Sequence, residues 1–295
     1  MLSRNDFLKW LLTSPFLFEM TKMKEVFNYF DSTSSTPKMP VLFLGHGSPM
    51  NAIEDNQFVQ GFKKMAGKIP KPEAILCISA HWYIKGTKIT GMEKPRVIYD
   101  FYGFPEELYK VKYPASGSPV LAQTVQELVK PTQTIIDQEW GLDHGAWTVL
   151  KYFFPKADVP VIQMSIDQNL STKEHFELGK KLSSLRNKGV LIVGSGNIVH
   201  NLSLVDFNNF HKDNFGYDWA IEARAQINDC ILNENYNPLF QYKSFSKAFQ
   251  YAIPTPEHFL PIMYILALKE KNETIHLFND KLLAGSLSMT SLYIH

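Results

Sequence analysis

The stretch LFLGHGSPM, residues 42–50, ends an apolar run at a Gly-His-Gly-Ser-Pro turn. The run starts at Val41 and ends at Gly45, which is typical of a short strand buried on both faces of a sheet. His46 therefore follows the carboxyl end of a predicted strand. Three further apolar runs have the same character: AILCISA (residues 74–80), VIQMSI (residues 161–166) and GVLIVGSG (residues 189–196).

Helix signals alternate with these apolar runs. Ser118 and Pro119 are a favourable cap and first position for one helix. Ser171 and Glu174 have capping-box spacing at the start of a second helix, and residues 217–231 have helical apolar periodicity. Alternating strands and helices predict an α/β fold, a single domain whose central, mostly parallel sheet has helices on both faces.

The charge and cysteine content exclude several classes of protein. Lys and Arg number 30 and Asp and Glu number 29, so the net charge of +1 gives no support to a nucleic-acid or membrane-surface role. Cys77 and Cys230 are the two cysteines of the chain, and a disulfide framework is not expected. These features favour a small-molecule ligand and a reducing, cytoplasmic location.

The first 38 residues are expected to be an N-terminal extension of a folded domain at 39–295. Residues 3–12, SRNDFLKWLL, resemble a twin-arginine export signal in which Asn5 replaces the second arginine. A polar Ser/Thr/Pro linker follows at residues 31–38. Export to the periplasm is the alternative to the cytoplasmic location.

Five histidines occupy positions suited to a ligand site. His46, His81 and His200 each follow a predicted strand. His258 lies in a proline-rich turn before a predicted helix, and His144 lies in an Asp-His-Gly turn between two tryptophans. The carboxyl ends of parallel strands meet at one edge of a sheet, where ligands bind. We therefore expect the site at that edge.

The residue type points to a metal as one interpretation of this pattern. Neutral imidazoles bind zinc or iron(II), and three protein ligands leave positions open for water, oxygen or substrate. A further histidine near the metal would serve as an acid or base. The alternative for each histidine alone is an ordinary turn residue with a satisfied hydrogen bond, and no compact helical metal motif is present in the sequence.

An aromatic segment, RVIYDFYGFPEELY at residues 96–109, is a candidate substrate-facing loop. Its aromatic side chains would form a wall for a flat ring. The alternative is a surface loop that its aromatic residues anchor to the core. The four candidates for contact with a substrate are Tyr99, Phe101, Tyr102 and Phe104.

Six motifs in order resemble those of the DOPA dioxygenases within the class III extradiol ring-cleavage dioxygenases, a group that includes the catalytic subunit of protocatechuate 4,5-dioxygenase. The resemblance covers nearly all of residues 40–291. The motifs are LFLGHGSPMNAI, ISAHWY, YDFYGFPEELY, WGLDHGAW, GSGNIVHNL and TPEHFLP.

The resemblance implies one non-haem metal per chain, Fe(II) for activity or Zn(II) as found bound. His46, His81 and His258 match the family's metal ligands, and His200 matches a histidine that becomes a fourth ligand when zinc is bound. Protocatechuate-type members use a glutamate as third ligand, so Glu257 is the alternative to His258.

The same resemblance implies extradiol cleavage of a catechol, such as DOPA, by O₂ to a ring-opened semialdehyde. His200 is then the acid/base and His144 contacts the substrate or relays protons. Two alternatives remain at this point: a zinc hydrolase with Glu257 or His200 as base, and a non-catalytic protein that binds a metal or a small ligand. The oligomeric state cannot be read from these residues.

Overall fold

The computed structural model describes residues 37–295. All but the last two residues of the predicted extension, including its export-like segment, lie outside the described residues. Within residues 37–295 no helix is long and apolar enough to cross a membrane.

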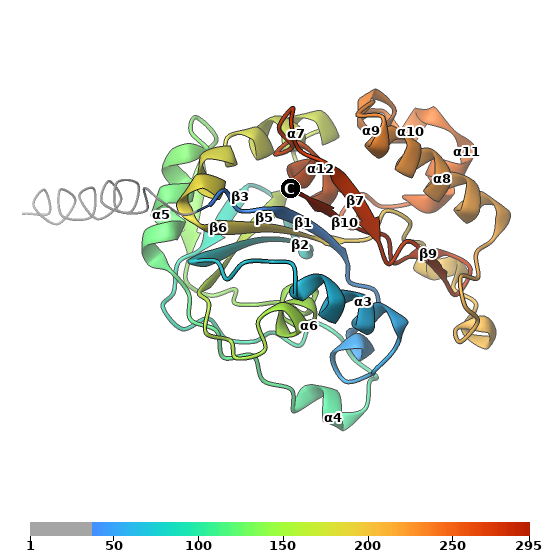
Figure 1. The fold of residues 1–295 in the computed structure, drawn as a ribbon, viewed down its shortest axis with the longest axis horizontal. Coiled ribbons are helices and arrows are strands. Elements are labelled where there is room, and N and C mark those ends of the chain that lie inside the picture. Colours follow the sequence, from blue (N-terminus) through green and yellow to red (C-terminus); the bar gives the residue numbers. More distant parts are fainter. Residues whose placement is uncertain (1–36) are drawn as a thin grey trace, which may run out of the picture.

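An eight-stranded sheet forms the centre of the domain, in the order β4-β3-β5-β2-β6-β1-β10-β7 (Figure 1). The adjacent strands β5, β2, β6 and β1 are parallel to one another. β10 and β7 extend the sheet in antiparallel pairing beyond β1. The strands are β1 (Val41–Gly45), β2 (Ala74–Ile84), β3 (Thr87–Thr90), β4 (Thr134–Asp137), β5 (Val161–Asp167), β6 (Val190–Gly196), β7 (Ile275–Phe278) and β10 (Ser291–Ile294), with a separate hairpin of β8 (Leu282–Leu283) and β9 (Leu287–Ser288).

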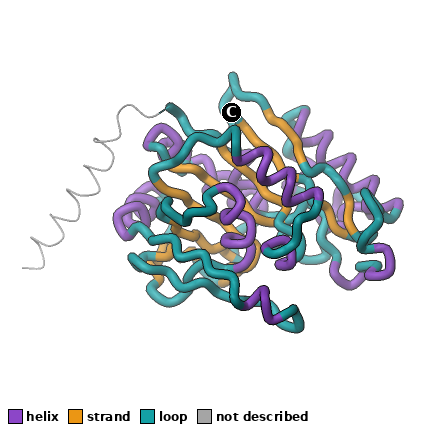
Figure 2. The backbone as a smooth tube through the Cα atoms, turned by 60° about the horizontal axis from the view of Figure 1, so that its bottom comes forward, coloured by secondary structure: helices purple, strands orange, loops and turns teal. Residues whose placement is uncertain are grey.

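Helices cover both faces of this sheet, as predicted (Figure 2). Residues of α3 (Gln57–Ala66) and α6 (His144–Phe153) pack on one face. The opposite face carries five helices: α5 (Pro119–Leu128), α7 (Thr172–Lys180), α8 (Asp218–Leu232), α11 (Lys247–Ala252) and α12 (Pro261–Leu266). The short helices α4 (Glu106–Tyr109), α9 (Asn237–Phe240) and α10 (Tyr242–Phe245) lie at the periphery.

The side chains of β1 alternate between the two apolar layers. Leu42 and Leu44 belong to the cluster under α3 and α6, whereas Val41 and Phe43 belong to the cluster under the other helices. All four are fully buried. Because successive strand residues point to opposite faces, a continuous apolar run is what a strand covered on both sides requires.

The local sequence signals are confirmed at several element boundaries. Ser118 caps α5 by accepting the amide hydrogen of Leu121, and Pro119 is its first residue. The capping box of Ser171 and Glu174 begins α7. The segment predicted as the third helix is α8, displaced by one residue at each end.

The structure corrects two predicted boundaries next to the site. β2 continues to Ile84, so His81 lies within the strand and not after it. Its register against β5 shifts between Ile78 and Tyr83, and such an irregularity can redirect a side chain without ending the strand. His144 is the first residue of α6 and not a turn residue, because the Asp143 carboxylate caps that helix by accepting from the Ala146 amide.

Candidate metal centre and substrate cavity

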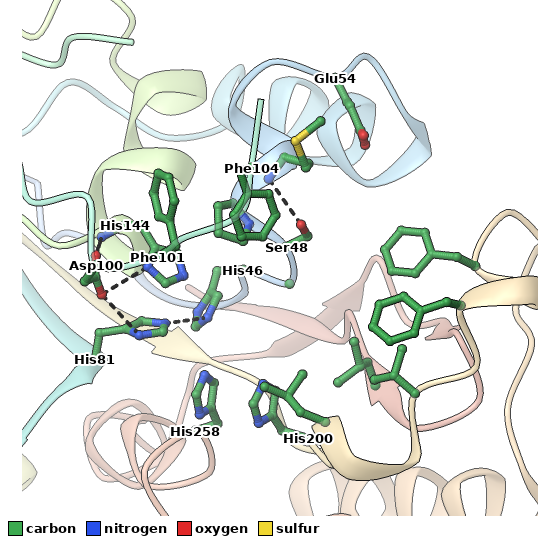
Figure 3. Close-up of a pocket in the computed structure, with 18 residues that line it drawn as sticks. His46, Ser48, Glu54, His81, Asp100, Phe101, Phe104, His144, His200 and His258 are labelled. Atoms are coloured by element: carbon green, nitrogen blue, oxygen red, sulfur yellow. Dashed lines mark hydrogen bonds and ion pairs between the residues drawn. The ribbon is translucent and has the colours of Figure 1, made fainter. Parts of the chain in front are cut away.

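A cavity of about 640 Å³ opens at the carboxyl ends of β1, β2 and β6 (Figure 3). Because these three strands run parallel, their carboxyl ends lie at the same edge of the sheet, as the sequence predicts. All five candidate histidines line this cavity: His46, His81, His144, His200 and His258.

His46 follows β1 and is buried, with 2% of its surface exposed. The turn requires small residues, because a Cβ on Gly45 would lie 2.6 Å from the Met289 carbonyl oxygen and Gly47 has a φ of +62°. The His46 Nδ1 lies 3.0 Å from the Ser195 hydroxyl oxygen. Ser195 donates its own hydrogen to the Gly145 carbonyl, so it accepts the Nδ1 proton of His46. The Nε2 of His46 is therefore left with a lone pair.

His81 approaches from β2 in the matching orientation. Its Nδ1 lies 3.3 Å from Asp100 Oδ2, which favours a proton on Nδ1, and its Nε2 lies 3.1 Å from the Nε2 of His46. Burial lowers the pKa of His81 to about 3 and that of His46 well below its ordinary value. Two neutral imidazoles thus turn unprotonated nitrogens toward each other.

His258 completes a group of three. Its Nδ1 lies 3.3 Å from Glu257 Oε1, and burial lowers its pKa well below the ordinary value. One nitrogen each from His46, His81 and His258 can be chosen so that all three lie within 4.8 Å of one another. Two ligands of one zinc or iron ion, each at about 2.0–2.1 Å, lie no more than about 4.2 Å apart, so the His46 and His81 pair fits a shared cation.

His200 lies on the outer side of this group. Its ring stacks on the His258 ring, with 3.5 Å between centroids and an interplanar angle of 7°. With Glu257 and His258 it forms another potential ligand group, which shares His258 with the group of His46 and His81. Burial lowers the pKa of His200 to about 4, so its imidazole is neutral at neutral pH.

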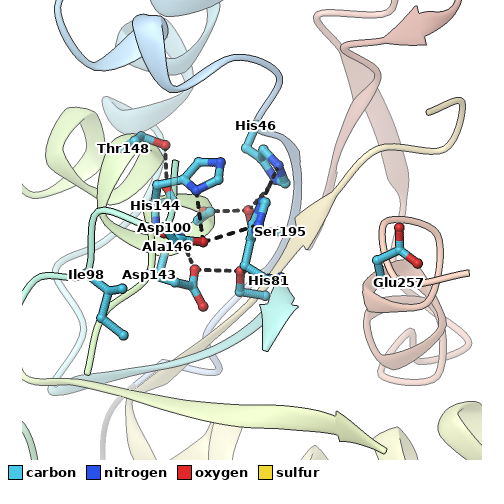
Figure 4. A network of polar contacts seen from close by, with 12 residues as sticks. His46, His81, Ile98, Asp100, Asp143, His144, Ala146, Thr148, Ser195 and Glu257 are labelled. Atoms are coloured by element: carbon cyan, nitrogen blue, oxygen red, sulfur yellow. Dashed lines mark hydrogen bonds and ion pairs between the residues drawn. The ribbon is translucent and has the colours of Figure 1, made fainter. Parts of the chain in front are cut away.

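Asp100 joins two of the histidines, and the sequence reasoning missed it (Figure 4). Its Oδ1 accepts the backbone amide hydrogen of His144, and its Oδ2 lies 3.0 Å from the His144 Nδ1 and 3.3 Å from the His81 Nδ1. Burial acts to raise the pKa of Asp100, but the His144 contacts and the neighbouring histidine charges hold it below its ordinary value. The signal was present, since Asp100 is the acidic residue of the YDFYGFP motif.

Asp143 belongs to the scaffold beneath the site. Its carboxylate is fully buried, accepts from Ser79 Oγ and Gln163 Nε2, and caps α6 through Ala146. Burial, followed by the nearby charge of Asp100, raises its pKa. It shapes the start of the helix that carries His144, and Asp100 is the carboxylate that contacts the His144 ring.

The aromatic segment contributes two of its four candidates to the cavity. Phe101 and Phe104 line it, and the Phe101 ring meets the His144 ring edge-on at 5.5 Å. Tyr99 and Tyr102 do not line it, which corrects that part of the prediction. The Tyr99 hydroxyl donates to the Val111 carbonyl at 2.6 Å, and Tyr102 is 92% exposed.

The sequence reasoning also missed the apolar side of the cavity. This apolar wall consists of Met50, Leu202, Val205, Phe207, Phe210 and Leu287. Four of these residues lie in the segment 202–210, which contains the 3₁₀ helices η3 (Leu202–Leu204) and η4 (Phe207–Asn209). The sequence signal for this wall is the recurrence of apolar side chains in an otherwise polar loop that follows a strand.

Comparisons with known proteins agree with one another on the family of this chain. The family model described as the catalytic LigB subunit of aromatic ring-opening dioxygenase matches residues 40–285. A protein of Escherichia coli strain K12 named 4,5-DOPA dioxygenase extradiol is 42% identical over 90% of this chain and 97% of its own length. A Beta vulgaris protein of the same name is 35% identical, covering 84% and 94%. The crystal structure of an uncharacterised protein from Escherichia coli K12 has 39% identity and a TM-score of 0.75, covering 87% of this chain and all of that one.

Proposed function

The chain belongs to the LigB family of aromatic ring-opening dioxygenases and is an extradiol dioxygenase, and on this premise we propose that it cleaves catechols at the histidine-lined cavity. Its substrates are then an aromatic ring and O₂, and members of this family depend on a metal.

His46, His81 and His258 are the proposed metal ligands. The observation that carries this assignment is the pair of Nε2 atoms of His46 and His81, 3.1 Å apart. Both rings have their Nδ1 atoms against an acceptor, Ser195 for His46 and Asp100 for His81. Facing lone pairs repel one another, and a shared cation turns that repulsion into coordination.

The metal proposed for catalysis is Fe(II), with Zn(II) as an alternative occupant without ring-cleavage activity. Iron(II) would supply a site where catechol oxygens and O₂ meet and electrons pass from the ring to oxygen. Zinc has no accessible redox change, so it would hold the substrate without supporting that transfer. Imidazole ligands accommodate either ion, and the ligand set supports both as occupants.

The proton transfers are assigned to His200 and His144. A catechol must lose a hydroxyl proton on binding, and a proton must return when the ring opens. His200 stacks on His258 and lines the same cavity, so its imidazole lies where it can accept that proton and return it. Asp100 holds the His144 Nδ1, which leaves its Nε2 for the substrate. Overall, the carbon–carbon bond beside the diol breaks, and both atoms of O₂ enter the ring-opened semialdehyde acid.

Phe101 and Phe104 are proposed to contact the aromatic ring. They line the cavity beside His144, and aromatic faces suit a flat ring. Relatives named for 4,5-DOPA make L-DOPA a reasonable first substrate to test, together with plain catechol.

Oxygen uptake by protein stripped of metal and reconstituted anaerobically tests the proposal. We expect O₂ consumption and a yellow ring-opened product with Fe(II), and neither with Zn(II). Equal product formation with both metals, or a hydrolytic product without O₂ uptake, would contradict it. Uptake without a ring-opened product would indicate simple catechol oxidation instead.

A further inference from the structure

The lining of the cavity combines two kinds of chemistry. The five histidines and Asp100 lie together and form its histidine end (Figure 3). The apolar wall defined above continues the same lining, and its Leu287 pairs with His200 in an isolated β-bridge. The volume of about 640 Å³ lies within the range of about 300–1,000 Å³ that holds drug-sized ligands. A catechol ring bound at the histidine end therefore leaves the apolar wall available for a substituent.

The apolar wall includes side chains that are costly to leave in water. Phe207 is 78% exposed and Leu202 is 65% exposed, yet both line the same cavity as the histidines. Val205 and Phe210 continue this surface along the segment 202–210. Exposed apolar side chains gathered around a cavity mark a surface that a ligand covers. The continuity with the histidine end identifies that ligand as the rest of the substrate.

The charges of the cavity disfavour an anionic substituent. Among the described residues that line it, the acidic groups are Asp100 and Glu54, and no lysine or arginine is present. A carboxylate on a substituent that lies against the apolar wall would find no lysine or arginine of the cavity lining as a partner, and the acidic groups of the lining would repel it. An uncharged hydrocarbon substituent meets neither penalty.

We propose that the preferred substrate is a catechol with an apolar substituent and without a carboxylate. This inference rests on the proposed ring cleavage. The substituent lies against the apolar wall, and Phe207 and Leu202 determine specificity by covering it. A catechol with a carboxylate-terminated substituent and no amine would then be a weaker substrate than an alkylcatechol of similar size.

The direct test compares catechols that differ in the length and the charge of one substituent. The probes are 4-methylcatechol, 4-butylcatechol, 3-(3,4-dihydroxyphenyl)propanoic acid and L-DOPA. For each probe we would measure kcat/KM with the Fe(II) protein in the presence of O₂. The dissociation constant would be measured under anaerobic conditions, because ring cleavage cannot proceed without O₂. Each buried methylene strengthens binding by up to about fourfold, so relative to 4-methylcatechol we expect 4-butylcatechol to have a kcat/KM at least about tenfold higher and a dissociation constant at least about tenfold lower. The propanoic acid should be weaker than 4-butylcatechol, and L-DOPA, whose ammonium the acidic groups attract, shows how far an amine offsets the carboxylate.

Variants of the apolar wall test the position of the substituent. Phe207→Ala should lower the preference for 4-butylcatechol over 4-methylcatechol by about threefold or more. Phe207→Lys should raise the relative kcat/KM of the propanoic acid, because it adds the missing cation. Phe245→Ala is the matched control, since Phe245 is 45% exposed on α10 and does not line the cavity. Leu202→Ala replaces Phe207→Ala if the latter fails to fold.

The outcomes separate this inference from the proposed function. Ring cleavage of every probe, with the propanoic acid equal to or better than 4-butylcatechol, would overturn the inference and keep the function. Anaerobic binding that follows chain length without any ring cleavage would support the inference about the wall and contradict the function. Absence of binding by all four probes would overturn both.

Discussion

The Nε2 atoms of His46 and His81 lie 3.1 Å apart, and each ring has its other nitrogen against an acceptor. Ser195 fixes the tautomer of His46 because its own hydrogen goes to a carbonyl. Asp100 does the same for His81 from the opposite side. Ser195 and Asp100 thus support the proposed metal site more strongly than the number of histidines does, because they determine which nitrogen of each ring keeps its lone pair.

Replacement of His46 or His81 by alanine should remove metal and activity together. Each substitution deletes one of the two facing nitrogens, and the remaining ligands are too few for tight binding. Metal content per chain after dialysis, measured by atomic emission, checks this. His276→Ala, at an exposed position on β7, is the control. A His46 or His81 variant that keeps full metal occupancy would remove that residue from the ligand set.

Asp100→Asn should lower kcat/KM or metal affinity by about ten- to a hundredfold, the usual effect of losing a carboxylate that orients metal-site histidines. The amide keeps the size of the side chain and removes the charge that faces His81 and His144. Activity and the metal dissociation constant, measured together, show which function is lost. Asp158→Asn, an exposed carboxylate that pairs with Lys71, should change neither. Unchanged values for Asp100→Asn would mean that the carboxylate does not position these rings.

His200→Ala should lower turnover by about a hundredfold or more while most of the metal stays bound. The expected loss is that of a general acid/base, and His200 lies outside the group formed by His46, His81 and His258. Single-turnover rates and metal content, measured on one sample, separate the two roles. Loss of stoichiometric metal would instead make His200 a ligand.

The sequence predicts the sheet well because burial on both faces leaves a simple pattern. The bounds of β1 were predicted without error, and the polar caps of α5 and α7 marked their starts. The continuation of β2 past Ala80 was missed, because a register shift against β5 depends on tertiary pairing and not on local composition.

The site was predictable in its histidines and less so in their partners. Parallel strands bring residues such as His46 and His200 to one edge, whatever their distance in sequence. Asp100 was not predicted as a site residue because its partners, His81 on β2 and His144 on α6, are distant in sequence. Local residue spacing does not indicate such contacts. The Tyr99 hydroxyl donates a hydrogen bond to the Val111 carbonyl. The aromatic composition of the segment does not show which of its rings line the cavity and which contact the rest of the protein.

His175 makes folding stability depend on pH at a position away from the metal site. It is fully buried between α7 and α12, with its Nδ1 2.8 Å from the Tyr264 hydroxyl, and burial lowers its pKa to about 4 against an opposing effect of Asp167. Between the unfolded value near 6.5 and about 4, the unfolded chain binds a proton that the folded chain does not. Stability therefore falls as the pH drops through this window, by on the order of 3 kcal/mol from this group. Urea unfolding at several pH values should show a shallower decline for His175→Gln than for the unmodified chain, with His276→Gln as control. Parallel pH curves for His175→Gln and the unmodified chain would show that the folded protein admits the proton at His175.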